Sequence, residues 1–168
     1  EKTTLSITGD EMLYHTRVVA RAAKNALVVA DMPFLSFQVS VPETVFNAGR
    51  FLKAGAHAVK VEGCRPIADS IKRLVELGIP VMGHLGLTPQ SVHQLGGYKL
   101  QGKSDPDAAR MLEDAQTLED LGCFSLVLEK IPAPLARKIS QSLKIPTIGI
   151  GAGPDCDGQI LVLYDLLG

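Results

Sequence analysis

The sequence has no tryptophan, and aromatic residues of all kinds make up 5% of its 168 positions. A hydrophobic core therefore has to be built from aliphatic side chains. The formal net charge is only −1, so the chain lacks the long-range field that gathers nucleic acid or anionic membrane surfaces. None of its apolar runs reaches the 18 or so residues that a bilayer-spanning helix needs. Small molecules are the expected partners, not nucleic acid or membrane.

Cysteine is also scarce. The three cysteines, Cys64, Cys123 and Cys156, are odd in number and widely separated. They lack the CxxC spacing of a structural zinc site. A disulfide framework is not indicated, and a reduced cytoplasmic setting is the simplest interpretation.

What the chain does have is a series of short apolar runs rich in β-branched residues. Their hydrophobicity is nearly continuous, which is typical of strands that are buried on both faces and usually parallel. The runs cover residues 26–30, 56–61, 79–83, 124–128 and 146–150.

Amphipathic patterns between these runs predict helices. The helices are expected to begin near Asp10, Pro42, Ile67, Asp107 and Pro134. Gly55, Gly78 and Gly122 each close a helix just before the next run begins. Repeated strand–helix units form either a barrel or an open doubly wound sheet. The longest interruption, residues 85–106, has the length of a functional loop.

Polar residues stand at the ends of successive runs, namely Asp31, Lys60, Glu62, His84 and Glu129. In β/α folds the ligand site lies at the C-terminal ends of the strands. Each residue alone has a structural explanation, such as a loop-closing role for Asp31 or a simple ion pair for Lys60 and Glu62. Their common position at one end of the sheet favours a functional site.

The residue types indicate a chemistry. Asp31 and Glu62 are hard oxygen ligands of the kind that Mg²⁺ takes from proteins. Lys60 and Glu62 are two residues apart, so both point to the same face of a strand, and Lys60 could receive a substrate carboxylate. Glu129 follows an apolar run and is a candidate general base, with a salt bridge to Lys130 or to a distant lysine as the alternative.

Several longer strings together resemble one enzyme family. They cover residues 28–34, 59–63, 83–90, 96–102, 126–129 and 148–153. The strings GHLGLTPQ, from Gly83 to Gln90, and GGYKLQG, from Gly96 to Gly102, are long and specific. In order and along essentially the whole chain, they resemble the 3-methyl-2-oxobutanoate hydroxymethyltransferase (ketopantoate hydroxymethyltransferase) family.

The resemblance implies a (βα)₈ TIM barrel of the phosphoenolpyruvate/pyruvate superfamily. It implies transfer of a one-carbon unit from 5,10-methylenetetrahydrofolate to 3-methyl-2-oxobutanoate, with Mg²⁺, in pantothenate biosynthesis, and a large homo-oligomer such as a decamer. By resemblance, Asp31 would bind both the metal and the keto acid, and Glu62 would be a second metal ligand. Lys60 and His84 would bind the keto acid, and Glu129 would be the proton acceptor.

The chain also departs from the family. A full barrel needs roughly 250 residues, and this chain matches strands three to eight, with residues 159–164 as the last strand. By comparison with the family it lacks the first strands, which carry another metal-binding aspartate and an adjacent serine, and the C-terminal segments. Residues 1–168 are thus expected to form a single partial barrel domain.

Two other functions fit the same residues. One is a related Mg²⁺-dependent α-keto-acid carbon–carbon lyase or mutase. The lyases of that superfamily carry a cysteine in a catalytic loop, and residues 86–102 contain none. The other is an inactive barrel remnant that retains the fold without the activity.

Overall fold

The computed structural model describes residues 3–168, and its centre is one parallel sheet. Its six strands lie side by side in chain order, and every neighbouring pair is parallel. They are β1 (Val29–Asp31), β2 (Ala58–Lys60), β3 (Val81–Gly86), β4 (Ser125–Glu129), β5 (Thr147–Ile150) and β6 (Gly158–Gln159).

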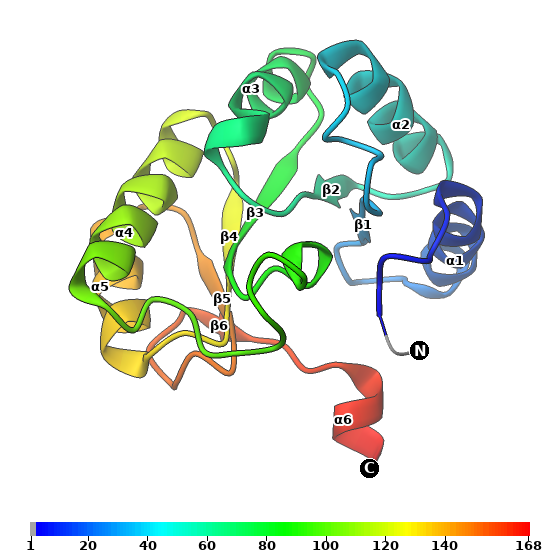
Figure 1. Cartoon of the computed structure of the whole chain (residues 1–168). Helices are drawn as coiled ribbons and strands as arrows, with labels where there is room; N and C mark the ends of the chain where they lie inside the picture. The colour runs from blue at the N-terminus through cyan, green and yellow to red at the C-terminus, as the bar shows by residue number, and fades with distance from the viewer. Residues whose placement is uncertain (1–2) are drawn as a thin grey trace.

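The longer helices lie outside the curve of the sheet, and the short C-terminal helix lies apart from them (Figure 1). The helices are α1 (Gly9–Ala22), α2 (Val41–Lys53), α3 (Ala68–Glu76), α4 (Asp105–Asp120), α5 (Ala133–Ser142) and α6 (Leu163–Leu167), with short 3₁₀ turns η1 (Arg65–Ile67) and η2 (Pro89–Ser91). A curled parallel sheet with each strand beside its predecessor is the arrangement of a (βα)₈ barrel, here incomplete.

Local signals explain where the helices begin and end. Ser40 and Ser104 cap α2 and α4 by accepting backbone N–H bonds from the third helical residue. Gly55, Gly78 and Gly122 follow α2, α3 and α4 with φ of 108°, 77° and 92°. These are left-handed conformations that favour glycine, and they confirm the predicted helix ends.

The core lies between the sheet and the outer helices, and it is aliphatic as predicted. Ile71, Leu74 and Leu118 from α3 and α4 are completely buried, as are Leu126 and Leu128 from β4. Each such side chain contributes about 1.5–3 kcal/mol through removal from water. The strand ends that carry the polar residues are therefore supported by a well-packed core.

The prediction of a last strand over residues 159–164 is wrong for most of its length. Strand β6 is confined to Gly158–Gln159, and the final bond to β5 is from the Ile160 N–H to the Gly149 carbonyl. After that hydrogen bond no segment of the described chain pairs with residues 161–164 as a neighbouring strand. Leu163–Leu167 form the helix α6 instead, in which the backbone groups bond to one another. The family resemblance predicted this strand, and the apolar residues here do not by themselves distinguish a strand from a short helix.

Within residues 3–168, no helix combines the length and the apolar character that crossing a membrane would require.

Candidate active site

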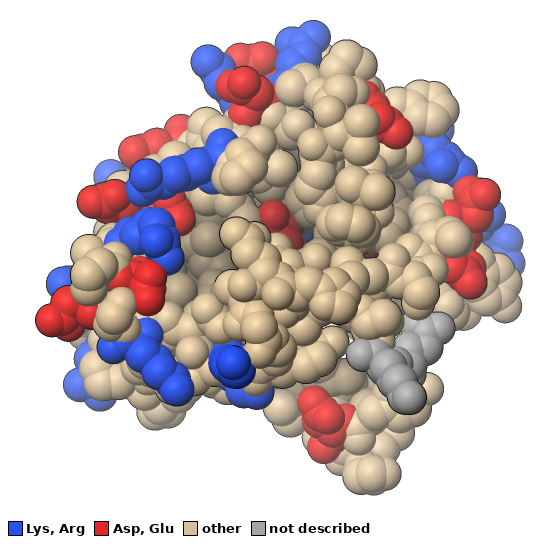
Figure 2. Space-filling model, in the orientation of Figure 1, with Lys and Arg blue, Asp and Glu red and all other residues tan. Residues whose placement is uncertain are grey.

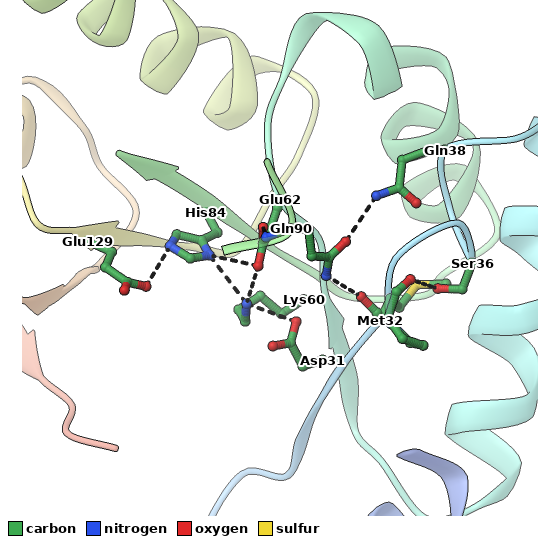
Figure 3. A network of polar contacts seen from close by, with 10 residues as sticks. Asp31, Met32, Ser36, Gln38, Lys60, Glu62, His84, Gln90 and Glu129 are labelled. Atoms are coloured by element: carbon green, nitrogen blue, oxygen red, sulfur yellow. Dashed lines mark hydrogen bonds and ion pairs between the residues drawn. The ribbon is translucent and has the colours of Figure 1, made fainter. Parts of the chain in front are cut away.

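The five residues singled out at the strand ends meet in one place. Asp31, Lys60 and Glu129 end β1, β2 and β4, Glu62 follows β2, and His84 lies in β3. All five line a cavity of about 790 Å³. Their side chains point toward one another (Figure 3).

The cavity has apolar walls and a charged floor. Inward-facing strand residues such as Val29, Met82, Val127 and Ile148 form part of the lining. In the space-filling view, acidic atoms lie at the bottom of a hollow, while most other charges lie around the outer rim (Figure 2). Apolar walls around a few polar groups are typical of small-molecule sites.

Lys60 occupies the centre of the polar network. Its ammonium nitrogen lies 2.8 Å from Asp31 Oδ1 and 3.9 Å from Glu62 Oε1. Because its side chain is only 17% exposed, solvent screens these ion pairs less than it would at the surface. One cation thus offsets two carboxylates, and a substrate carboxylate would have to compete for the same charge.

Glu62 is the most strongly perturbed acid in the network. Burial raises the pKa of its carboxyl to about 7, and the nearby charges of Asp31 and Glu129 push it the same way. Lys60 and a backbone hydrogen bond from Gln90 oppose the rise in pKa. Glu62 therefore exchanges its proton near neutral pH, where a bound cation would hold it ionised.

His84 is buried between Lys60 and Glu129. Its Nε2 lies 3.2 Å from Glu129 Oε2, although the angle is not that of a hydrogen bond. Burial lowers the pKa of the imidazole, and the contact with Glu129 only partly offsets that effect. A neutral ring near pH 7 follows from this.

Glu129 faces the cavity because it lies two residues after Val127 in β4, on the same face of the strand, and the chain turns sharply after it. Lys130 has a φ of 50°, an unusual left-handed conformation for a residue with a side chain. Its ammonium donates to the Tyr98 carbonyl at 2.6 Å. Within residues 3–168 no ion pair joins Glu129 to Lys130 or to any other lysine, so the salt-bridge alternative is wrong.

The sequence reasoning missed Gln90 as a functional residue. Its backbone N–H donates to Glu62 Oε2 at 2.9 Å, and its side-chain amide donates to the Met32 carbonyl at 2.8 Å. The residue belonged to the specific string from Gly83 to Gln90. That string showed resemblance, but no spacing rule connects it to residues near position 32.

The glycine-rich stretch from Gly149 to Gly153, at the end of β5, lies beside the candidate site. Gly151 lies in a left-handed conformation, with φ of 61°, and an added Cβ there would lie 3.7 Å from the Lys130 backbone. Ile150 lines the main cavity together with Glu129. The stretch thus packs beside the end of β4.

A model of the ketopantoate hydroxymethyltransferase family matches residues 1–168. The chain belongs to this family. A relative named 3-methyl-2-oxobutanoate hydroxymethyltransferase from Syntrophus aciditrophicus (strain SB) is 62% identical over 168 residues, or 99% of this chain. Another of that name, from Geobacter metallireducens, is 58% identical over 166 residues, or 98% of this chain. The chain spans 62% of the length of each relative.

Solved structures of other proteins share the fold of this chain. Phosphoenolpyruvate phosphomutase from Streptomyces platensis subsp. rosaceus has a TM-score of 0.68 at 13% identity, over 96% of this chain and 63% of that one. A 2,3-dimethylmalate lyase of the PEP mutase/isocitrate lyase superfamily has a TM-score of 0.61 at 17% identity, over 89% of this chain and 54% of that one. These matches confirm the predicted fold.

The family resemblance implies Mg²⁺ at Asp31 and Glu62, and the donor set fits that ion. Asp31 Oδ1 is buried and lacks a hydrogen bond, since Lys60 approaches it outside hydrogen-bond angles. Mg²⁺ usually takes one or two carboxylates and completes its shell with water and substrate. Among residues 3–168 no group of three or more His, Cys, Asp and Glu side chains forms a complete metal cage. Asp31 and Glu62 would thus supply two oxygen ligands to the ion.

Proposed function

We propose that the protein transfers a hydroxymethyl group from 5,10-methylenetetrahydrofolate to 3-methyl-2-oxobutanoate, the first step of pantothenate biosynthesis. The observation that carries the proposal is the meeting of two carboxylate ligands, a lysine and a candidate base in one cavity of a chain from this family. Relatives that are 58–62% identical have the corresponding name.

Asp31 and Glu62 would hold Mg²⁺ at the C-terminal ends of strands β1 and β2. When bound, the ion polarises the keto acid and makes the hydrogen on the carbon next to its carbonyl more acidic. Glu62 is suited to this part because its carboxylate is oriented by the Gln90 N–H. Asp31 is suited because one of its oxygens has no hydrogen bond.

Lys60 would bind the negative end of the keto acid. Its ammonium already faces two carboxylates, and the same charge stabilises the enolate that develops when the proton leaves. Because the side chain is only 17% exposed, the interaction is stronger than it would be in bulk water. His84 closes this side of the cavity as a buried neutral ring.

Glu129 would remove the proton from C3 of the keto acid. The new carbon–carbon bond then joins C3 to the one-carbon unit, and the bonds from that carbon to both folate nitrogens break. One water molecule supplies the hydroxyl oxygen. The hydrogens of the water and the proton from C3 together supply the hydroxyl hydrogen and the two N–H hydrogens of tetrahydrofolate.

A Glu129→Gln variant tests the role of the base. General-base removal lowers a rate by about 10²- to 10⁴-fold, so exchange of the C3 proton of the keto acid in deuterated water should fall by that amount. Proton NMR follows the exchange. Glu43→Gln, a change on the exposed side of α2, is the matched control and should exchange like the unaltered protein.

Two results separate the possibilities. Unchanged exchange in Glu129→Gln would remove Glu129 as the base. Absence of ketopantoate when the unaltered protein is incubated with keto acid, methylenetetrahydrofolate and Mg²⁺ would reject the function itself.

We also propose that the protein works in the cytoplasm as a homo-oligomer. Cys64, Cys123 and Cys156 are all free thiols, which suits a reducing compartment. The segment from Ile160 to Leu167 exposes seven large hydrophobic side chains, each at least half exposed, and association would remove such surface from water. Light scattering on the purified protein would reveal a monomer if the assembly is wrong.

A further inference from the structure

We propose that Gln90 is a positioning residue that fixes the Glu62 carboxylate and the backbone next to Asp31, the two groups assigned to one cation. The inference rests on the proposed function, because it assigns these carboxylates to Mg²⁺. Gln90 itself does not touch the reacting atoms in this scheme. It acts through the Glu62 carboxylate and through the backbone that follows Asp31.

The need for such a residue arises where the β1–β2 ladder ends. Asp31 pairs with Lys60 in the parallel register, and the next bond runs from the Met32 N–H to the Lys60 carbonyl at 3.1 Å. Beyond it the two segments diverge. Because Met32 is completely buried, its own carbonyl needs a partner from elsewhere.

Gln90 supplies that partner. Its side-chain Nε2 donates to the Met32 carbonyl at 2.8 Å, across 58 positions of sequence. Met32 directly follows Asp31, so this hydrogen bond restrains the backbone that carries the first carboxylate. Sheet pairing restrains the Asp31 backbone from one side, and Gln90 restrains the residue after it from the other.

The same residue orients the second carboxylate. The Gln90 N–H donates to Glu62 Oε2 at 2.9 Å, which leaves Glu62 Oε1 directed toward Lys60 at 3.9 Å. The Glu62 side chain is only 5% exposed, so water does not readily replace this hydrogen bond. One residue therefore touches both segments that carry the proposed ligands (Figure 3).

A third contact sets the orientation of the Gln90 amide. Gln38 Nε2 donates to Gln90 Oε1 at 3.0 Å, which leaves Gln90 Nε2 for Met32. Gln38 is exposed, so water can replace it as a donor. The contact of Gln90 with Met32 should matter more than its contact with Gln38, and this difference provides a control.

The primary test compares Gln90→Met with Gln38→Met. Methionine keeps the approximate length of glutamine but cannot donate to the Met32 carbonyl. Loss of groups that support metal ligands typically weakens metal affinity by 10- to 100-fold. We expect Gln90→Met to weaken Mn²⁺ binding, measured without turnover by electron paramagnetic resonance, by at least about tenfold, and Gln38→Met by less than about threefold.

Kinetics supply a second readout that general loss of structure would not produce. The Mg²⁺ concentration for half-maximal activity should rise by about tenfold in Gln90→Met, while kcat at saturating Mg²⁺ recovers to within about threefold of the unaltered value. Gln90→Asn keeps the amide but is one methylene shorter, so it should show the same shift. It also serves as the test if Gln90→Met does not fold.

The outcomes distinguish this inference from the proposed function. If the unaltered protein binds Mn²⁺ and forms ketopantoate, but both Gln90 variants bind the ion as tightly as it does, the positioning role is overturned. If the unaltered protein neither binds the ion nor forms ketopantoate, the proposed function fails first.

Discussion

The ammonium nitrogen of Lys60 lies 3.3 Å from Nδ1 of His84. An ammonium group can only donate hydrogen bonds, so Nδ1 has to accept, and a neutral His84 carries its proton on Nε2. That nitrogen is the one 3.2 Å from Glu129 Oε2. Lys60 therefore sets the direction in which the buried imidazole offers its proton, as well as the charge of the cavity.

Replacing Lys60 by Met should change both properties. Removal of the cation leaves the carboxylates of Asp31 and of the buried Glu62 uncompensated. Leaving a buried charge without its partner is strongly unfavourable. We expect the KM for the keto acid to rise by at least tenfold, or about 1.4 kcal/mol. Nitrogen NMR should show that His84 no longer populates one neutral tautomer. Lys138→Met, on the exposed side of α5, is the control, and a KM unchanged in Lys60→Met would contradict the assignment.

Gly86 and Gly63 provide a matched test of close packing beside the site. Both have a φ of 95°, but an added Cβ meets nothing within 4 Å at Gly63, whereas at Gly86 it overlaps the Glu129 carbonyl. Gly63→Ala should cost about 1–2 kcal/mol for the left-handed backbone. Gly86→Ala should cost roughly 1–3 kcal/mol more, because the overlap adds to the strain. Urea unfolding measures both, and equal losses would show that the overlap relaxes freely.

Asp157 should make the stability depend on acid pH. Hydrogen bonds from the Thr147 N–H and hydroxyl lower the pKa of its carboxyl below the ordinary value. A lowered folded-state pKa means that the stabilisation is present above the unfolded-state pKa and is lost as the pH falls through the folded-state pKa. The stability difference between the unaltered protein and Asp157→Asn should thus be constant above about pH 5 and shrink toward pH 2. Urea unfolding measured across this pH range tests the prediction. A stability difference between the two proteins that does not change with pH would show that Asp157 is not the source of the acid dependence.

The three thiols should differ in reactivity. Burial raises the pKa of Cys64 to about 11 and that of Cys123 to about 12, and both side chains are buried. Cys156 is only partly buried. Because the thiolate is the reactive form, iodoacetamide at about pH 8 should label Cys156 first in the folded protein and all three residues in urea. Mass spectrometry of the peptides measures the order, and early labelling of Cys64 or Cys123 would contradict it.

Much of the fold could be predicted because it depends on local patterns. Continuous apolar runs indicated buried parallel strands, and Gly55, Gly78 and Gly122 marked helix ends because only glycine readily adopts their backbone angles. The position of Asp31, Lys60 and Glu129 after three such runs was enough to place them at one end of the sheet. The strand over residues 159–164 was predicted from the family resemblance and is absent over most of that range, because strand formation depends on a neighbouring segment to pair with.

The sequence by itself determined which residue types stand at the strand ends, because strand direction and side-chain alternation follow from short-range periodicity. Only the tertiary structure decided how those residues act on one another. It placed Lys60 between two carboxylates, raised the pKa of Glu62 to about 7, and brought Gln90 to Met32 across 58 positions. Burial and through-space charge depend on distances between segments, and no local pattern contains those distances.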